Sequence, residues 1–350
     1  MICLGIESTA HTFGIGIISY SIDKKQKIEQ NKTIILANVK DAFTSSGAGM
    51  VPSKVADHHV EVCDAVIKQA LEKAKISLVE VDIISYSASP GLGHTLRIGA
   101  MVARSLAVQI KKPVVGVNHC IAHLEIGRLL TKAKDPVLLY LSGANTQVIS
   151  FEAGRYRVMG ETLDIGVGNF LDTFARELGL GFPGGPKIEE LAKNGKKLIE
   201  LAYPLKGMDM TFSGLLTFLK QLIQKKDFFQ EYTQEDLCFS VQETVFALLT
   251  EVAERALARC DKQELLLGGG VACNKRLQEM CRIMCAERGA QLFVPENQFL
   301  VDNGAMIAWL GILEYSAGHS IDYNVLGKIT MDKIIIDPYL RTDEVVIAYR

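Results

Sequence analysis

The same local pattern begins each half of this 350-residue chain, and no other feature limits the fold as strongly. Residues 2–19 read as a strand, the small polar turn 7–12 and a second strand. Residues 137–151 repeat this order around the polar turn 142–146. Such turns present backbone N–H groups to a phosphate, although the first copy alone is also typical of a plain surface hairpin. An internal duplication explains both copies, and it predicts an α/β fold with two similar lobes around a cleft.

The chain is long enough for two domains with separate cores, since 48% of its residues are hydrophobic. Lys134-Asp135-Pro136 precedes the second copy of the pattern and predicts the lobe boundary. We therefore expect a first lobe over residues 1–134 and a second lobe over residues 135–350. Within the second lobe we expect a helical insertion at about 164–260, together with a C-terminal segment that can cross back to the first lobe.

The net charge of the chain excludes a protein that holds nucleic acid through a uniformly basic surface, because the formal charge is −2. Residues 187–226 are locally basic through a group of lysines. A solvated helical face explains most of these lysines, but this segment is the best candidate for contact with RNA. An RNA partner would therefore need this local patch or help from another subunit.

Eight cysteines occur without a CxxC pair, and no secretory leader precedes the first strand. This pattern indicates reduced thiols in an intracellular protein. No apolar run approaches the roughly 20 residues that span a membrane. We expect a cytoplasmic protein, also nuclear if the source is eukaryotic, with no membrane partner.

His119 and His123 lie four residues apart in a predicted helix, so their side chains share a face and could bind one cation. The preceding run 112–117 predicts a buried strand, which places the pair beyond its carboxyl end, where open α/β sheets bind ligands. Ordinary polar positions at a helix start would show the same spacing. His58 and His59 are adjacent and therefore point apart on a helix, where structural roles or contact with a partner are expected.

Three other segments suggest ligand contacts in the second half of the chain. Glycines 268–270 separate a predicted strand from a helix and would allow a nucleotide to approach the backbone closely. Residues 181–186 contain too much glycine and proline for regular structure, and they lead into a helix. Asp302 stands at a predicted helix N-cap, and a carboxylate there is most often only a cap.

Together, these segments resemble one known family. The matching motifs run nearly end to end in the family's order: GIESTAHT at 5–12, NHCIAH at 118–123, YLSGANTQ at 140–147, GETLDIGVGNFLD at 160–172, FPGGP at 182–186, KGMDMTFSG at 206–214, GGVACNKRLQEM at 269–280, DNGAMIA at 302–308 and RTDEV at 341–345. The chain resembles the tRNA N6-adenosine threonylcarbamoyltransferases, in the archaeal and eukaryotic branch once described as O-sialoglycoprotein endopeptidases. Members of this branch are the catalytic subunits of the KEOPS (EKC) complex.

The resemblance implies the actin-like ATPase (ASKHA) fold, with two ribonuclease-H-like lobes around a nucleotide and metal cleft. It implies one divalent metal per subunit, iron or zinc, on His119, His123, Tyr140 and Asp302. The nucleotide and acyl-adenylate contacts that it implies are Tyr140, Leu141, Ser142, Gly143, Ala144, Asp172, Gly185, Glu189 and Asn274. An ATP- or AMP-type nucleotide would occupy this part of the cleft.

The chain departs from the family pattern at two places. Ala144 stands where members usually have a second glycine, and its methyl group would strain the turn if φ were positive. His11-Thr12 stands where the bacterial branch has an acidic pair, so bacterial proposals for a base do not transfer to this chain.

The implied reaction moves a threonylcarbamoyl group from threonylcarbamoyl-AMP to N6 of adenosine 37 in tRNAs that read ANN codons, which forms t6A. An adenine amine is a poor nucleophile because its lone pair is delocalised into the ring, so activation of the acyl group and fixed geometry must supply the catalysis. Glu7 or His11 is hypothesised to accept a proton near the first turn. The implied partners are tRNA, a small kinase (ATPase) subunit and the accessory KEOPS subunits.

Two functions of other classes compete with this interpretation. A zinc protease of the HExxH type is discounted, because Cys120 follows His119 where the motif requires glutamate. An actin-fold ATPase or kinase-like scaffold subunit without acyl-transfer activity would bind ATP through the same loops, and the fold alone does not exclude it. Hydrolysis of ATP without formation of modified adenosine would favour this second alternative.

Overall fold

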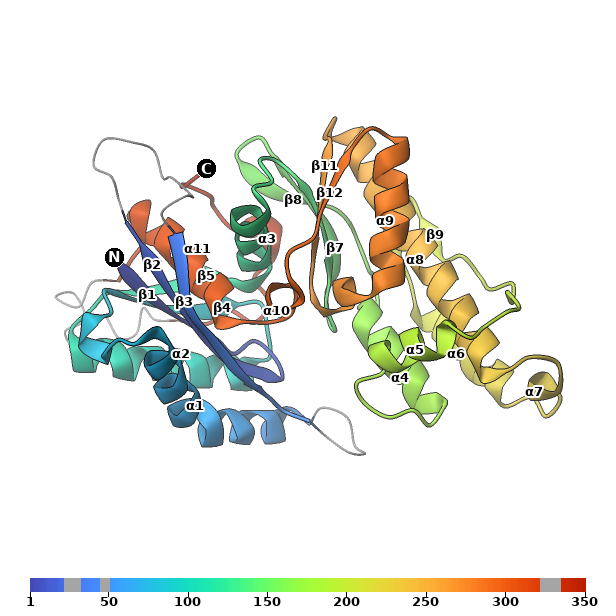
Figure 1. Cartoon of the computed structure of the whole chain (residues 1–350), viewed down its shortest axis with the longest axis horizontal. Helices are drawn as coiled ribbons and strands as arrows, with labels where there is room; N and C mark the ends of the chain where they lie inside the picture. Colours follow the sequence, from blue (N-terminus) through green and yellow to red (C-terminus); the bar gives the residue numbers. More distant parts are fainter. Residues whose placement is uncertain (22–32, 45–50, 322–334) are drawn as a thin grey trace. The chain divides into compact units, whose positions relative to one another are not determined.

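The computed structural model describes residues 1–21, 33–44, 51–321 and 335–350 of the chain (Figure 1). These residues form two compact units. The first unit contains Met1–Leu130 and Asp302–Arg350, and the second contains Thr131–Val301. The lobe boundaries expected from the sequence stay a prediction, because compact packing does not by itself show that a segment folds independently.

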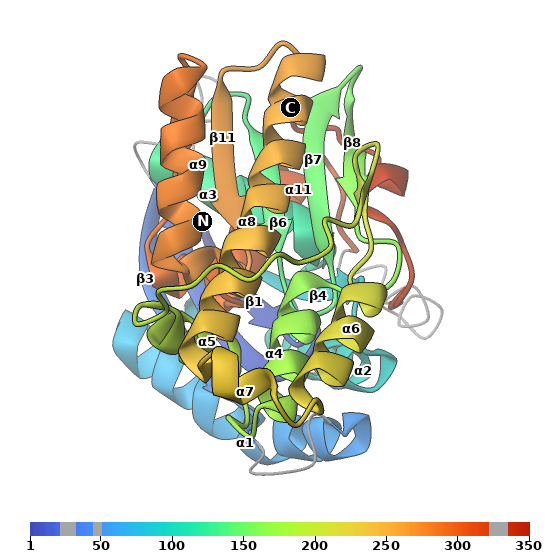
Figure 2. The same cartoon turned by 90° about the vertical axis from the view of Figure 1, so that its right-hand side faces the viewer.

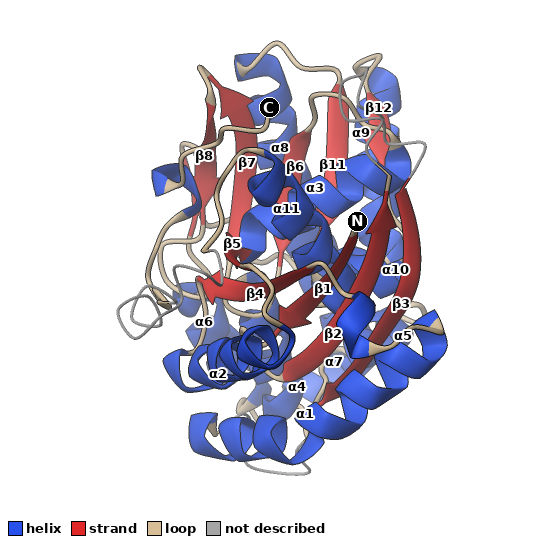
Figure 3. Cartoon of the chain, turned by 90° about the vertical axis from the view of Figure 1, so that its left-hand side faces the viewer, coloured by secondary structure: helices blue, strands red, loops and turns tan. Residues whose placement is uncertain are grey.

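A mixed five-stranded sheet forms the centre of the first unit (Figure 3). Its strands are β1 (Ile2–Glu7), β2 (Thr12–Tyr20), β3 (Thr33–Ala42), β4 (Ile83–Ser89) and β5 (Val114–Asn118). They lie in the order β3-β2-β1-β4-β5. β2 is antiparallel to both β1 and β3, whereas β4 runs parallel to β1 and β5 runs parallel to β4.

Helices cover both faces of this first sheet. Helices α1 (Pro52–Ala74) and α2 (Gly93–Ile110) pack on one face, and α11 (Gly304–Ser316) packs on the other. The unit also contains α3 (His119–Thr131), which follows β5, and the short 3₁₀ turns η2 (Leu78–Glu80) and η6 (Thr342–Glu344). Strand residues alternate between the faces, so Leu4 and Ile6 join the core formed with α1 and α2. Gly5 faces α11 instead, and a Cβ atom there would lie 2.2 Å from the Ala308 backbone nitrogen. The sheet can therefore approach α11 this closely only with glycine at this position.

The second unit repeats the strand arrangement of the first. Its strands are β6 (Val137–Leu141), β7 (Thr146–Glu152), β8 (Arg155–Glu161), β11 (Glu264–Gly268) and β12 (Gln291–Phe293), in the order β12-β11-β6-β7-β8. As in the first unit, three antiparallel strands come first in sequence, and the two later strands are parallel to the first. The duplication predicted from the sequence is confirmed in this topology.

Most helices of the second unit come after β8 and before β11 in the sequence. They are α4 (Val167–Glu177), α5 (Gly185–Ala192), α6 (Ser213–Ile223), α7 (Phe228–Glu231) and α8 (Gln234–Arg259), with the small hairpin β9 (Leu205–Lys206) and β10 (Asp209–Met210). The 3₁₀ turn η3 (Gly270–Cys273), α9 (Lys275–Glu287) and α10 (Asn297–Leu300) follow later in the chain. Figure 2 shows α8 and α9 side by side on one face of the sheet. Thr233 and Asp236 form the capping box that begins α8, which explains its sharp start.

All eight cysteines lie in described segments, and each is a free thiol. Among the helices that the structure describes, we find none with the length and apolar composition needed to cross a bilayer.

Candidate functional site

The two histidines singled out in the sequence begin helix α3 of the first unit. The helix follows β5 directly, and the Asn118 side chain accepts hydrogen bonds from the backbone N–H groups of Cys120 at 3.0 Å and Ile121 at 3.2 Å. This asparagine cap fixes the start of the helix, so His119 and His123 occupy its first turns. Both imidazoles are buried, with 4% and 2% of their residue surfaces exposed.

Asp302 brings a carboxylate to this histidine pair from a distant part of the sequence. Its Oδ1 atom lies 3.4 Å from Nε2 of His119 and 3.3 Å from Nε2 of His123. Ligand atoms around a tetrahedral zinc ion lie about 3.3 Å apart, so these two spacings match the edges of such a site. One donor atom from each of the three residues lies within 4.8 Å of the others. Two imidazole nitrogens and a carboxylate oxygen are suitable donors for a divalent transition metal.

The sequence interpretation of Asp302 as a helix cap is wrong. The side chain of the next residue, Asn303, accepts the Met306 N–H at 3.0 Å and caps α11. The Asp302 carboxylate is thereby left to face the histidines. Two adjacent polar residues at a helix start look alike in sequence, and the fold decides which one caps the helix.

Glu7 lies behind His119 and is fully buried at the end of β1. Its Oε2 atom lies 2.9 Å from Nδ1 of His119, and its Oε1 atom accepts the Thr9 backbone N–H at 2.7 Å. The Thr9 hydroxyl also donates to Oε1 and lies 3.2 Å from His119 Nδ1. The contact between Thr9 and His119 is not evident from the sequence, since the two residues are 110 positions apart. A carboxylate two residues before a hydroxyl residue, at a strand end, is the local signal that could have suggested this turn.

The electrostatics of the group favour a cation. Burial opposes a charge on His119, but the carboxylates of Glu7 and Asp302 outweigh burial and raise the pKa of His119 well above its ordinary value. Burial lowers the pKa of His123. Burial alone would raise the pKa of Asp302, but hydrogen bonds from both histidines hold that pKa well below its usual range. The buried carboxylate of Glu7 and the partly exposed carboxylate of Asp302 thus face two buried imidazoles, and a divalent cation would balance the carboxylate charge.

His11 occupies a different part of the first turn. Its backbone carbonyl accepts the Phe43 N–H at 2.8 Å, and its charge acts on His59. His59 is buried with its ring against the edge of Phe13, whereas His58 points to Asp41 at 2.9 Å. The two adjacent histidines of α1 therefore point apart, as predicted.

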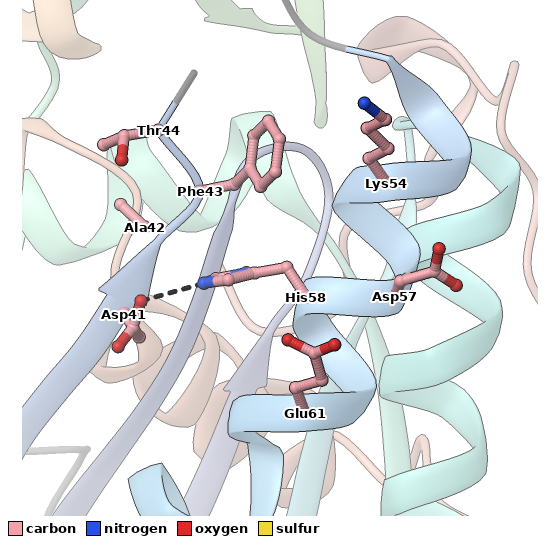
Figure 4. A pocket seen from close by; sticks show the side chains of 8 residues that line it. All are labelled: Asp41, Ala42, Phe43, Thr44, Lys54, Asp57, His58 and Glu61. Carbon is pink, nitrogen blue, oxygen red and sulfur yellow. Dashed lines mark hydrogen bonds and ion pairs between the residues drawn. The ribbon is translucent and has the colours of Figure 1, made fainter. Parts of the chain in front are cut away.

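A pocket of about 460 Å³ opens beside His58 (Figure 4). The figure shows Asp57 and Glu61 on α1 and the His58 ring turned toward Asp41 at the end of β3. The other lining residues are Ala42, Phe43, Thr44 and Lys54. None of the predicted site residues lines this pocket.

The turn between β6 and β7 carries the first group of predicted nucleotide contacts. Ser142 closes the turn, since its hydroxyl accepts the Asn145 N–H at 3.0 Å. The carbonyl groups of Ser142 and Gly143 accept N–H groups from the start of α4. The backbone N–H groups of Gly143 and Ala144 donate to no residue that the structure describes. The φ angle of Ala144 is not positive, so its methyl group does not strain the turn.

A close approach joins this turn to the glycine segment after β11. Gly269 has φ +89°, and a Cβ atom there would lie 2.3 Å from the Leu141 carbonyl oxygen. Only glycine combines this backbone conformation with this contact. Tyr140, at the end of β6, is 1% exposed and belongs to the same sheet. Its assignment as a metal ligand stays a prediction.

The remaining predicted nucleotide contacts take part in hydrogen bonds that connect neighbouring segments of the second unit. Asp172 on α4 accepts the Gly184 N–H at 2.7 Å, at the start of α5. Glu189 on α5 accepts the Lys275 N–H at 2.8 Å, and Asn274 caps α9. A Cβ atom at Gly185 would meet nothing within 4 Å, so open space borders it. The structure thus links α4, α5 and the start of α9, which are far apart in sequence.

Several lysines of residues 187–226 already have partners in the second unit. Lys193 pairs with Glu190, Lys220 pairs with Glu177, and Lys197 donates to the Glu231 carbonyl. These contacts agree with a largely solvated helical surface, in which acidic neighbours reduce the local positive charge. Contact of this segment with RNA stays a prediction.

Known proteins resemble this chain in sequence and in fold, and the sequence relatives are the ones that show the family. The family model described as tRNA N6-adenosine threonylcarbamoyltransferase matches residues 33–309. Proteins of that name from Thermococcus kodakarensis and Thermococcus sibiricus are each 49% identical over 349 residues, which cover 100% of this chain and of the relative. A probable bifunctional tRNA threonylcarbamoyladenosine biosynthesis protein of Methanocaldococcus jannaschii is 48% identical over 345 residues, covering 99% of this chain and 60% of that protein.

Solved structures with much lower identity have the same fold. HypF of T. kodakarensis matches with a TM-score of 0.60 at 15% identity, covering 91% of this chain and 48% of that one. The activator of the 2-hydroxyisocaproyl-CoA dehydratase from Clostridium difficile matches with a TM-score of 0.52 at 11% identity, covering 91% and 97%. These likenesses, with the two repeated sheets, show the actin-like ATPase fold.

Proposed function

The chain belongs to the tRNA N6-adenosine threonylcarbamoyltransferase family, and we infer from this membership that it transfers a threonylcarbamoyl group to N6 of an adenosine in tRNA. The finer proposal is that the acceptor is adenosine 37 of tRNAs that read ANN codons and that the donor is threonylcarbamoyl-AMP. In this transfer the N6–carbonyl bond forms, the bond from the carbonyl to the phosphate oxygen breaks, and AMP leaves with its electron pair. N6 loses one proton.

We propose that His119, His123 and Asp302 hold one divalent metal, iron or zinc, with Tyr140 as a fourth ligand. The carboxylate-to-imidazole spacings of 3.4 and 3.3 Å are the single observation that carries the proposal. When bound, the metal supplies Lewis acidity for a donor oxygen. His119 and His123 are buried and Asp302 is partly exposed, so the site is shielded on the histidine side, and the carboxylate charge favours a cation over a neutral ligand.

The second unit is proposed to bind the AMP part of the donor. Gly143 and Ala144 offer backbone N–H groups that no described residue uses, and a phosphate could accept them. Tyr140, Leu141 and Ser142 continue this turn into β6. Asp172, Gly185, Glu189 and Asn274 would line the ribose and adenine, with open space at Gly185 in support of this placement.

The first turn is a poorer phosphate site than the sequence suggests. The Ser8 backbone N–H donates to the Ser87 hydroxyl at 3.0 Å, and the Thr9 backbone N–H donates to Glu7. Both donors are therefore used within the first unit. His11, which lies farther along the turn, is retained as the proposed acceptor of the N6 proton.

Partners complete the proposal. A chain with a net charge of −2 lacks the charge to hold tRNA alone, so tRNA would be presented with the help of a small kinase subunit and accessory KEOPS subunits. The probable bifunctional relative is longer than this chain, which is consistent with a second component acting beside it. We propose a cytoplasmic location, also nuclear in a eukaryote.

The test is a transfer assay with the full chain. The chain, with and without its partner subunits, is incubated with threonylcarbamoyl-AMP and a substrate tRNA, and the digested nucleosides are measured by mass spectrometry. We expect modified adenosine that depends on the chain, and none with a tRNA that carries guanosine at position 37. Hydrolysis of ATP without modified adenosine would instead support the ATPase or kinase-like scaffold.

A further inference from the structure

We propose that Glu7 is a positioning residue, which holds the His119 ring in the tautomer whose Nε2 lone pair faces the metal position beside Asp302. The inference rests on the metal site of the proposed function. It replaces the hypothesis that Glu7 accepts a proton from the substrate.

The contacts of Glu7 determine where the ring proton of His119 lies. Oε2 of Glu7 faces Nδ1 of His119 at 2.9 Å, and an ionised carboxylate can only accept a hydrogen bond. A cation that binds at Nε2 displaces the proton there, and the neutral ring that remains keeps its proton on Nδ1 against Glu7, with the Nε2 lone pair 3.4 Å from Oδ1 of Asp302. Carboxylates placed behind ligand histidines act in this way in metalloproteins.

Both carboxylate oxygens of Glu7 are already engaged in hydrogen bonds within the first unit. Oε1 accepts both the backbone N–H and the hydroxyl of Thr9, while Oε2 serves His119. The residue is 0% exposed, so a substrate amine does not reach it in this conformation. The hydrogen bonds from Thr9 orient the Glu7 carboxylate. The turn after β1 therefore fixes the position of the His119 ring.

The test uses Glu7→Gln and Glu7→Ala in the full chain without tRNA, with Zn²⁺ as the probe in competition with a chromophoric chelator. Glutamine fills the same space but has only one acceptor atom. If its amide nitrogen faces His119, the ring accepts at Nδ1 and carries its proton on Nε2, where it blocks the metal. If the amide nitrogen faces Thr9, it meets another N–H donor. We expect Glu7→Gln to weaken zinc binding about 10- to 100-fold.

The alanine variant separates positioning from packing. Without the carboxylate, the Thr9 hydroxyl at 3.2 Å from Nδ1 can accept the ring proton and preserve the tautomer. The proposal therefore predicts that Glu7→Gln binds zinc no better than Glu7→Ala. A residue that only fills space would give the reverse order, with glutamine near wild type and alanine severely impaired, and that order would overturn the proposal.

Glu314→Gln is the matched control. Glu314 is also a buried carboxylate of the first unit that faces a histidine Nδ1, here His319 at 2.7 Å, but it is not among the metal candidates. We expect the zinc affinity of the Glu314→Gln variant to stay within about threefold of wild type, because Glu314 contacts none of the proposed zinc ligands. An equal loss in this control would show that buried carboxylates affect zinc only through general stability, which would contradict the proposal.

A measurement on the wild-type chain does not depend on the folding of any variant. In zinc-loaded protein with ¹⁵N-labelled histidine, we expect a slowly exchanging proton on Nδ1 of His119 and the metal on Nε2. Zinc on Nδ1, or no zinc binding by the wild-type chain, overturns the proposal. If zinc affinity depends on Glu7 as expected but the transfer assay yields no modified adenosine, the result contradicts the proposed function and leaves the role of Glu7 standing.

Discussion

The two units share one sheet topology, but they use the turn after their first strand in opposite ways. In the first unit, the backbone N–H groups of Ser8 and Thr9 donate to side chains of the same unit, and Glu7 contacts the ring of His119, a proposed metal ligand. In the second unit, the donors of Gly143 and Ala144 bond to no described residue. The two copies of the fold thus use this turn differently. In the first copy the turn orients side chains, and in the second its backbone N–H groups are available to a ligand. The strand order is retained, while the hydrogen-bonding use of the turn differs.

The largest effect is expected from removing a ligand of the first unit. His123→Ala should lower the rate of threonylcarbamoyl transfer by about 10³-fold or more, because the metal loses one of three close donors. The transfer assay measures this loss, and equilibrium dialysis with Zn²⁺ measures the metal. AMP affinity should stay within about threefold, because the proposed AMP contacts lie in the other unit. His58→Ala, which removes a histidine paired with Asp41, serves as the control. A comparable loss in both variants would contradict the division of roles.

The next largest effect is expected on the free energy of unfolding, when a glycine of the first sheet that packs against α11 is replaced. A Cβ atom at Gly16 would lie 2.0 Å from the Ala305 backbone nitrogen, so Gly16→Ala should destabilise the protein by about 3 kcal/mol. Gly214→Ala, in α6 of the second unit, meets no atom within 4 Å and should be neutral or slightly stabilising. Urea unfolding measures both changes. Equal effects would mean that close packing against glycine is not what holds α11 to its sheet.

The free energy of unfolding should depend on pH through His59, a buried histidine of the first unit. Burial lowers the pKa of His59 to about 4, with the nearby charges of His58 and His11 acting in the same direction. The unfolded state therefore binds a proton at higher pH than the folded state does, and the stability contribution is full above about pH 6.5 and decreases as the pH falls toward 4. Between pH 7 and pH 5 the loss should be about 2 kcal/mol. In denaturant titrations, His59→Gln should show a flatter dependence on pH, and an unchanged slope would contradict the assignment.

The smallest effect is expected at the second turn. Ala144→Gly restores the residue that relatives usually have, but the φ angle at this position is not positive, so no strain is relieved. AMP affinity should change by less than about threefold, and stability should fall by about 0.5–1 kcal/mol, because glycine loses more backbone entropy on folding. Calorimetric titration with AMP measures the affinity. A large gain in affinity would show that the alanine methyl group obstructs the phosphate position.

Sequence reasoning predicted the central strands of both sheets but missed three of their four edge strands, β3, β8 and β12. The runs 2–6 and 137–141 are apolar and buried on both faces, so their composition alone predicts a strand. The outer strands β3 and β8 mix exposed and buried residues with charged side chains, as solvent-facing edges do. Their place in the sheets depends on pairing with β2 and β7, which a local pattern does not encode.

By itself, the sequence determined the duplicated α/β framework, the helical spacing of His119 and His123 and, through its motifs, the family. These properties depend on local periodicity and on residue order. Only the tertiary structure decided that Asp302, 179 positions after His123, faces the histidines while Asn303 caps the helix. It also decided that Glu7 is enclosed behind His119. Such contacts arise because the folded sheet brings the end of β1, the end of β5 and the start of α11 together, and sequence separation carries no information about that distance.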